Sequence, residues 1–567
     1  MYVLGLSAFA HDPAAALLNE KGIVAAIEEG KLVRSRAVSG IPREAIRFCL
    51  EQGGIDWSAL RAVAIAGRPV RAWFRQAMFR AKFTPLAPVS SGYYQSKALG
   101  ELGRELNNIR ILELMSEQSS GHVIRLDHQV CHAASAFYAS PYEKSLILSL
   151  DESGDGRSGL VAVGEGKNIR PWQWIPFPHS IAWVYSQVTE LLGFQPHQEE
   201  HKTQWLSQVG KPDLKSLFLE LLRRNANPYP QVDLRFFNRG KAGRIAFSKM
   251  FLDCLGIESG TDPRVPESMR AMVAASLQSA SETVVSEYLE SLRKKTGCQN
   301  LCLAGGLFLN PPLVAAIEKD TGFDHSFVQP ASGTEGTALG AAWLVWHKIL
   351  GEPRLAPPAN LYLGPGFSNE AIKLVLDNCK ASYHWMNSES EKFDETVRLL
   401  LAGKIVGWYQ GAAEFGPRAL GNRSLFASPW AGYVRENLND FVKHRESFRP
   451  FALSVPEEDC ARWFKISSNG EYLTTLGVAL PESRELFKDF LLPFDRVRLH
   501  VISRDANPQL WQLLKRFGGS SPAPVLVNTS FNLFGEPLVI APRDAVRSYF
   551  CSGMDALVAG NFLLSKS

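Results

Sequence analysis

Apolar and polar residues alternate in short blocks at the beginning of the chain. Apolar runs occupy residues 3–9, 14–19 and 22–29, and they are separated by the polar turn at residues 11–13 and by Gly22. Runs of this length between turn residues predict three strands in a meander. A helix is predicted over residues 42–52, and the apolar stretch 61–67 predicts a buried strand after it.

The same plan recurs after residue 144. Apolar runs at residues 146–153, 159–166 and 168–175 predict a second meander, and residues 178–193 have helical spacing. This repetition indicates a duplicated α/β fold of the actin and sugar-kinase type. Further elements are predicted from the pattern: one or two long helices over residues 263–295, a strand, a glycine turn and a helix start over 300–310, and a helix of small residues over 336–350.

A domain boundary is indicated by composition. Gly and Pro occupy seven of the seventeen positions from 351 to 367. We therefore predict a first domain over residues 1–352, a linker over 353–368 and a second α/β domain over 369–567.

Composition narrows the class of protein. The chain has 567 residues, 61 Lys and Arg against 57 Asp and Glu, and 46% hydrophobic residues, which excludes a disordered or collagen-like chain. It has no apolar run of membrane-spanning length and no basic region of a signal peptide, so we expect a cytoplasmic protein. Its eight cysteines form no Cys-x-x-Cys pair, which argues against a disulfide scaffold or a zinc ribbon.

Residues 70–83 interleave basic and aromatic side chains. They fit a surface patch for nucleic acid or membrane, and they also fit an amphipathic helix whose aromatic face packs inward. The near-neutral charge of the whole chain does not support the first interpretation. We therefore expect no nucleic-acid or membrane partner.

Three residues form a candidate metal site. His128 and His132 stand four apart on a predicted helix and so share one face, and Asp151 ends a predicted strand. Two imidazoles and a carboxylate suit a divalent metal, although a histidine pair at this spacing is also common in a helix core or on a helix surface.

Glycine turns indicate a nucleotide cleft. Gly154 begins a Gly-x-Gly-x-x-Gly turn, but a strand follows it where a dinucleotide site requires a helix. Gly305 and Gly306 follow another predicted strand, and Asn310 is placed to cap the next helix. The sequence has no Gly-Lys-Ser/Thr, so it has no Walker A loop.

Basic residues gather in the second domain within turns between apolar residues. These positions are Arg418, Arg423, Lys443, Arg445 and Arg449. Guanidinium groups bind phosphate oxygens through two parallel hydrogen bonds, so the cluster predicts an anion pocket. The alternative is a solvated basic face.

Eight motifs together resemble a known family. They are AHDPAAALL, the helix HAASAF, the strand end LDESGDG, PHSIAWVYSQVTELLGF, LAGGLFLN, EFGPRALGNRS, KHRESFRPFA and NTSFNLFGEP. Together these motifs, which span nearly the whole chain, resemble the nodulation, cephamycin and aminoglycoside O-carbamoyltransferases. The resemblance implies an actin-like N-terminal domain similar to threonylcarbamoyl transferase and a C-terminal domain similar to threonylcarbamoyl-adenylate synthase.

The resemblance also implies the reaction. ATP, with Mg²⁺, and carbamoyl phosphate would form carbamoyl-adenylate, and the carbamoyl group would pass to a hydroxyl of a specialised metabolite. In the C-terminal site, carbamoyl phosphate and ATP would contact Arg418, Arg423, Lys443, Arg449, Asn528 and Ser530, with Arg418 and Lys443 acting in catalysis. In the N-terminal site, a metal would bind His128, His132 and Asp151, the nucleotide would contact Gly154, Lys202, Gly305, Gly306 and Asn310, and His11 would be the base.

The chain departs from the family pattern in three places. Gly30 and Lys31 replace Glu-Arg, the residues around Lys202 differ, and Thr334 replaces an aspartate that supplies a fourth metal ligand. A hydroxyl is a poor substitute for a carboxylate, so we predict that iron or another divalent metal binds weakly.

Two other classes of function stay open on sequence grounds. A sugar kinase or ATP-binding chaperone shares the actin-like fold, but the chain lacks an Asp-x-Gly-Thr loop in residues 1–12. A non-enzymatic scaffold would have no need of the basic cluster. We expect a small-molecule acceptor with a free hydroxyl as partner, and a homodimer stays open.

Overall fold

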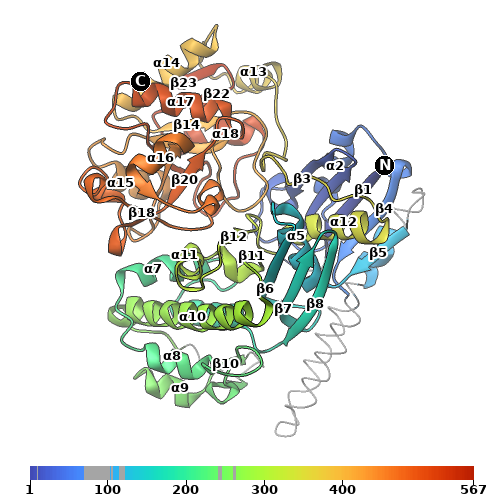
Figure 1. The fold of residues 1–567 in the computed structure, drawn as a ribbon. Helices are drawn as coiled ribbons and strands as arrows, with labels where there is room; N and C mark the ends of the chain where they lie inside the picture. The colour runs from blue at the N-terminus through green and yellow to red at the C-terminus, as the bar shows by residue number, and fades with distance from the viewer. Residues whose placement is uncertain are drawn as a thin grey trace. The chain divides into compact units, whose positions relative to one another are not determined.

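The computed structural model describes residues 1–8, 11–68, 103, 106–113, 122–239, 245–258 and 263–566 (Figure 1). The segment 70–83, with its two interpretations, lies outside the described residues. The chain divides into two compact units: residues 1–22, 39–42 and 53–357 form the first, and residues 23–38, 43–52 and 358–567 form the second.

Two five-stranded sheets share one strand order. The first runs β3-β2-β1-β4-β5, and the second, taken from its other edge, runs β8-β7-β6-β11-β12. In the first sheet β1 pairs antiparallel with β2 and parallel with β4. In the second sheet β6 pairs in the same way with β7 and β11. The strands are β1 (Tyr2–Ser7), β2 (Ala14–Asn19), β3 (Gly22–Glu28), β4 (Leu60–Ala66), β5 (His122–Leu126), β6 (Lys144–Gly154), β7 (Arg157–Glu165), β8 (Asn168–Pro176), β11 (Asn300–Ala304) and β12 (His325–Val328).

This repeated order confirms the predicted duplicated actin-like fold. Helix α5 (His128–Ala139) packs against α12 (Gly336–Leu344), which also lies against β1. Glycines permit the close approach, because a β-carbon at Gly340 would lie 1.9 Å from the Cys131 carbonyl oxygen and one at Gly5 would lie 2.1 Å from that of Ala338.

The other helices of the first unit include one long element. Residues 263–295 contain a single helix, α10 (Glu267–Thr296), which ends at Gly297 in the left-handed conformation (Figure 1). Other described helices are α6 (Ile181–Leu191), α7 (Glu200–Leu206), α8 (Lys215–Leu221), α9 (Lys249–Cys254) and α11 (Pro311–Asp320), and β9 (Phe237–Arg239) pairs antiparallel with β10 (Ile245–Phe247).

The second unit contains an eight-stranded mixed sheet in the order β13-β23-β22-β14-β15-β21-β16-β20. Its strands are β13 (His384–Trp385), β14 (Val406–Tyr409), β15 (Arg423–Ala427), β16 (Ala452–Pro456), β20 (Leu499–Ile502), β21 (Leu526–Ser530), β22 (Ala556–Ala559) and β23 (Phe562–Ser565). A small sheet contains β17 (Phe464–Lys465), β18 (Gly477–Ala479) and β19 (Arg496–Val497).

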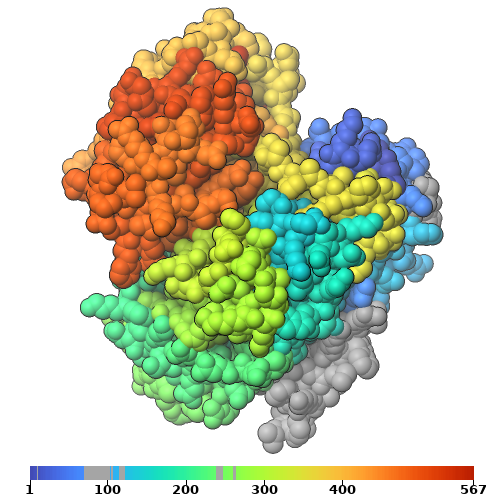
Figure 2. All heavy atoms as spheres, in the orientation of Figure 1, coloured from blue at the N-terminus to red at the C-terminus, as the bar shows by residue number. Residues whose placement is uncertain are grey.

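Each face of the large sheet has its own hydrophobic core. One core joins the sheet to α13 (Asn369–Asn378) and α18 (Pro542–Phe550), and the other joins it to α14 (Glu389–Leu401) and α17 (Pro508–Gly518). Tyr409 enters the first core and Trp408 the second, as the two-residue period of a strand requires. Side chains fill the space between the ribbons of each unit (Figure 2).

The second unit also contains the helices α1 (Glu29–Leu32), α16 (Glu457–Trp463) and, except for its last residue, α2 (Arg43–Gly53). Among the residues that the structure describes, no helix is long and apolar enough to cross a membrane.

Candidate functional site

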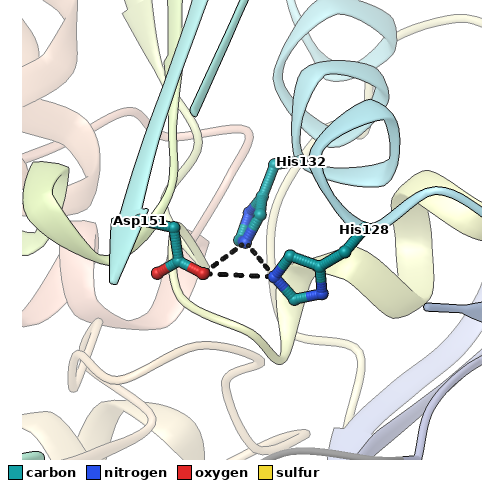
Figure 3. Close-up of side chains that lie close together, drawn as sticks. All are labelled: His128, His132 and Asp151. Carbon is teal, nitrogen blue, oxygen red and sulfur yellow. Dashed lines mark hydrogen bonds and ion pairs between the residues drawn. The ribbon is translucent and has the colours of Figure 1, made fainter. Parts of the chain in front are cut away.

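His128, His132 and Asp151 meet at the end of β6 (Figure 3). The two Nε2 atoms of the histidines are 3.1 Å apart, and Asp151 Oδ2 lies 3.1 Å from that of His128 and 3.5 Å from that of His132. All three side chains are buried. His128 and His132 therefore lie on one face of α5, as the sequence predicted.

Two carboxylates hold the backbone at the start of α5, where His128 lies. Asp127 caps α5 by accepting a hydrogen bond from the Gln129 backbone N–H, and it pairs with Arg157 at 2.8 Å. Asp155, in the β6–β7 turn, accepts the backbone N–H of His128 at 2.9 Å. On the other side of the cluster, Gly306 donates its backbone N–H to Asp151 Oδ1 at 3.2 Å.

The three groups shift one another's pKa. Burial favours the neutral carboxyl, but the two imidazoles hold the pKa of Asp151 well below its usual range. Burial lowers the pKa of both histidines; at His128 the hydrogen bond and charge of Asp151 outweigh it and raise the pKa, whereas at His132 the pKa stays lowered.

The donor set fits a divalent transition metal. Bonds of about 2.0–2.2 Å place neighbouring donors of a tetrahedral or octahedral site roughly 3.0–3.5 Å apart, and the three donor distances lie in that range. Thr334, at the position of the fourth family ligand, is buried and offers only a hydroxyl.

His11 follows β1 and lies in the turn before β2. Its Nδ1 is 2.9 Å from Asp12 Oδ2, and its side chain is 55% exposed. Desolvation lowers the pKa of this imidazole, but the hydrogen bond of Asp12 and the charges of Asp12, Asp151 and Glu152 raise it to about 9. His11 is therefore not an imidazole of ordinary pKa: it is protonated at neutral pH and is a strong base once it loses that proton.

The structure shows the positions of the residues of the first unit that are predicted to contact a nucleotide. Gly305 (φ 98°) packs on β6, where a β-carbon would lie 2.2 Å from the Leu150 carbonyl oxygen. Asn310 caps α11, as predicted, and its amide also pairs with Gln278. Lys202 is buried on α7 beside Glu199 at 2.7 Å. Their nucleotide contacts stay predictions.

The second unit brings Lys443 and Ser530 together, as the sequence predicts. The Lys443 ammonium donates to the Ser530 carbonyl at 2.8 Å and to Asn532 Oδ1 at 2.6 Å. Burial and the charges of Arg445, Arg449 and Arg36 lower the pKa of Lys443 far below its usual range.

Arginines around Lys443 form a partly buried cationic cluster. Burial and the charge of Arg449 lower the pKa of Arg418 to about 10 and that of Arg445 to about 9. Burial and three of these guanidinium groups lower the pKa of Arg498 strongly. Arg445 Nη2 is buried without a hydrogen-bond partner among the residues that the structure describes. An anion bound beside these groups would offset the repulsion that Arg449 exerts on Arg418 and Arg445. We call Arg418, Lys443, Arg445, Arg449 and Arg498 the cationic cluster.

Two further residues of the predicted anion site, Arg423 and Asn528, lie on the neighbouring strands β15 and β21. Arg423 is fully buried, stacks on Tyr409 and donates to the carbonyls of Pro365, Gln410, Gly411 and Asn422. Its guanidinium is thus occupied by backbone, and it shapes the turn before β15. Asn528 donates to Ser454 Oγ and to His500 Nδ1, both at 3.1 Å.

Sequence reasoning missed Arg498 and His500. Arg498 stands in the run Arg-Val-Arg-Leu-His, where an alternating strand pattern gives a basic residue no special weight. His500 is buried, and burial together with Arg498 lowers its pKa to about 3, so it is neutral. Because Nδ1 accepts from Asn528, the ring proton is on Nε2.

The chain is thus an α/β protein of two compact units, with a buried His-His-Asp cluster in one and the cationic cluster in the other. Two models of known families match the chain: the carbamoyltransferase N-terminus matches residues 2–343 and the carbamoyltransferase C-terminus matches residues 397–566. The chain belongs to the carbamoyltransferase family and is an enzyme, as the motifs predicted.

Individual relatives cover different shares of the chain. An uncharacterized protein of Synechocystis sp. is 32% identical over 100% of this chain and 97% of its own length. The nodulation protein NolNO of Sinorhizobium fredii is 31% identical over 98% of this chain and 79% of its own. The 3'-hydroxymethylcephem-O-carbamoyltransferase of Amycolatopsis lactamdurans is 29% identical over 52% of this chain and 54% of its own.

Among solved structures, component A of the Acidaminococcus fermentans (R)-2-hydroxyglutaryl-CoA dehydratase is 14% identical and covers 60% of this chain and 96% of its own, with a TM-score of 0.34.

Proposed function

We propose that this enzyme is an ATP-dependent O-carbamoyltransferase that moves the carbamoyl group of carbamoyl phosphate, through carbamoyl-adenylate, to a hydroxyl of a specialised metabolite. The observation that carries the proposal is the cationic cluster, because burial and neighbouring guanidinium charges lower the pKa values of its arginines, and a bound anion would offset the repulsion between them. Carbamoyl phosphate and the triphosphate of ATP supply such anions.

The second unit would form the adenylate. Water cleaves carbamoyl phosphate to carbamate and phosphate; a carbamate oxygen then attacks the α-phosphorus of ATP, the bond to the β-phosphate breaks, and pyrophosphate leaves. The chemistry gathers negative charge on phosphoryl oxygens, and fixed cations stabilise that charge. Arg418, Arg449 and Arg498 would bind phosphate, and Lys443, fixed by Ser530 and Asn532, would complete the site.

The first unit would carry out the transfer. The acceptor hydroxyl attacks the carbamoyl carbon, AMP leaves, and the hydroxyl proton goes to His11 in its neutral form. The carboxylates that raise the pKa of His11 make this neutral form a strong base. Gly305 and Gly306 let backbone approach the nucleotide. A divalent metal held by His128, His132 and Asp151 would supply a Lewis acid for the adenylate phosphate.

The proposal is tested with the purified full chain, ATP, Mg²⁺ and carbamoyl phosphate in the presence of candidate hydroxyl acceptors. We expect AMP, phosphate and pyrophosphate to form and the acceptor to gain the mass of one carbamoyl group. Carbamoylation that proceeds equally well without ATP would overturn the adenylate route.

A further inference from the structure

Residues 28–36 lie far from the second domain in sequence and belong to the second unit in space. They comprise the last residue of β3, helix α1 and the four residues after it, and we call them the β3–α1 segment. Sequence patterns place this segment in the first domain. Its side chains instead contact two loops of the second unit. One loop contains Arg418, and the other contacts Lys443; both residues belong to the cationic cluster.

The first contact is made by Lys31 on the turn at residues 414–416. The Lys31 ammonium donates to the carbonyls of Glu414 and Gly416, each at 2.7 Å, and pairs with Glu28 at 2.9 Å. Glu28 in turn accepts the backbone N–H of Gly416 at 2.8 Å. All of these groups are buried, and burial raises the pKa of Glu28 despite the charge of Lys31.

The turn held by Lys31 carries Arg418. Beyond Gly416, the buried Glu414 carboxylate accepts the backbone N–H groups of Leu420, Asn422 and Arg423 at 2.9, 2.9 and 3.2 Å. Lys31 therefore fixes one end of a loop whose other end is folded around a carboxylate. Arg418 lies between these two anchors.

The second contact is made by Arg36 on the loop after β21. Arg36 donates to the Glu536 carbonyl through Nε at 3.2 Å and through Nη2 at 2.9 Å. The same carbonyl accepts from Asn532 Nδ2 at 2.7 Å, and Asn532 Oδ1 accepts from Lys443 at 2.6 Å. A continuous chain of hydrogen bonds thus runs from Arg36 to the ammonium of Lys443.

Repulsion within the cationic cluster explains why such anchors matter. Burial and the charge of Arg449 lower the pKa values of Arg418 and Arg445, and burial with the charges of Arg418, Arg445 and Arg449 lowers the pKa of Arg498, so these cations repel one another. A loop without regular secondary structure between residues 410 and 422 would yield to this repulsion. Hydrogen bonds between the backbone of this loop and buried charged side chains hold the loop in place against the repulsion.

From this geometry we infer that Lys31 and Arg36 are positioning residues for the cationic cluster, so that the adenylate-forming site is incomplete without the β3–α1 segment. Lys31 holds the loop of Arg418, and Arg36 holds Asn532 against Lys443. The expected change in KM rests on the proposed function. The expected effect on the position of the two loops rests on the hydrogen bonds alone.

The test compares Lys31→Met and Lys31→Arg in the full chain, with Lys373→Met as the control. Lys373 is an exposed lysine of the second unit that pairs with Asp377. We expect Lys31→Met to raise the KM for carbamoyl phosphate about tenfold, which corresponds to roughly 1.4 kcal/mol, with a smaller change in kcat. Lys31→Arg keeps the charge and its donors and should restore most of the affinity.

Hydrogen–deuterium exchange gives a readout that needs no activity. In Lys31→Met we expect faster exchange at residues 416–423 and wild-type exchange in α5 of the first unit. Wild-type exchange at residues 416–423, or an arginine variant no better than the methionine variant, would overturn the inference. Faster exchange throughout the second unit would also overturn it, because Lys31 would then be a general stability residue.

The two proposals fail in distinguishable ways. If the wild-type enzyme releases no pyrophosphate from ATP and carbamoyl phosphate, the proposed function is wrong. The positioning role is then decided by exchange at residues 416–423 and by the affinity for inorganic pyrophosphate, measured by calorimetry on the same variants.

Discussion

A β-carbon at Gly154 would lie 2.0 Å from Cδ2 of His128. The glycine therefore leaves room for an imidazole, and its place at the end of β6 sets the position of that ring beside Asp151. This contact gives a physical reason for glycine in the β6–β7 turn in addition to the nucleotide contact that the sequence suggested.

Gly154→Ala should push His128 out of the cluster and weaken metal binding. One of three ligands would be displaced, so we expect at least a tenfold loss in metal affinity, as for the loss of supporting contacts around metal ligands. The measurement is a titration with a divalent metal followed by elemental analysis. Gly432→Ala is the control, since a β-carbon there has open space; equal metal binding in the two variants would remove this role from Gly154.

Thr334→Asp should strengthen the metal site. An aspartate at this position would add a carboxylate ligand to the two imidazoles and Asp151, and we expect more metal to stay bound after dialysis against a chelator. Thr334→Asn has nearly the same shape without the charge and serves as the control. If the natural protein already retains one full equivalent of metal under these conditions, the weak-site prediction is wrong.

His11→Asn should separate the two half-reactions. Asparagine keeps a hydrogen-bonding edge but cannot take up the acceptor proton, so transfer should fall about a hundredfold or more. Pyrophosphate release from ATP and carbamoyl phosphate should stay at the wild-type rate, because it takes place in the second unit. Loss of both activities in a folded variant would contradict the base assignment.

The same residue predicts a pH dependence for transfer. The folded pKa of His11 is raised to about 9, so the neutral base accumulates, and transfer accelerates, as the pH rises through about 9. Asp12→Asn removes a hydrogen bond and a negative charge and should move this rise to lower pH. A profile that is the same for both proteins would show that His11 is not the titrating base.

His500 predicts a loss of stability in acid. Its pKa is about 3 in the folded protein and near 6.5 in the unfolded chain, so below pH 6.5 the unfolded chain takes up a proton that the folded protein does not. This term should cost about 2 kcal/mol of stability between pH 7 and pH 5. Urea unfolding of His500→Gln should lack that loss, whereas the exposed His384→Gln should keep it; a wild-type slope in His500→Gln would refute the assignment.

Local pattern was sufficient for the strands, for the clustering of His128, His132 and Asp151 and for the cap at Asn310, because each depends on short-range patterns in the sequence. The spacing of His128 and His132 defines a helix face, and Asp151 follows from the end of a strand. Local pattern gave no sign of the four backbone carbonyls to which Arg423 donates, or of Arg498, which looks like an ordinary strand residue. The contact of Lys31 with Glu414 joins residues 383 positions apart, and no local pattern encodes it.

The central claim is that the cationic cluster activates carbamoyl phosphate in the absence of an acceptor. The most direct measurement is pyrophosphate release from ATP, with and without carbamoyl phosphate, by the wild-type enzyme and by Arg418→Ala and Lys443→Ala, with the exposed Arg398→Ala as the control. We predict release that depends on carbamoyl phosphate in the wild type and in Arg398→Ala. Loss of one phosphate-binding cation removes about 3 kcal/mol of transition-state stabilisation, so release should fall by a hundredfold or more in the two cluster variants. Wild-type release in both cluster variants would contradict the account.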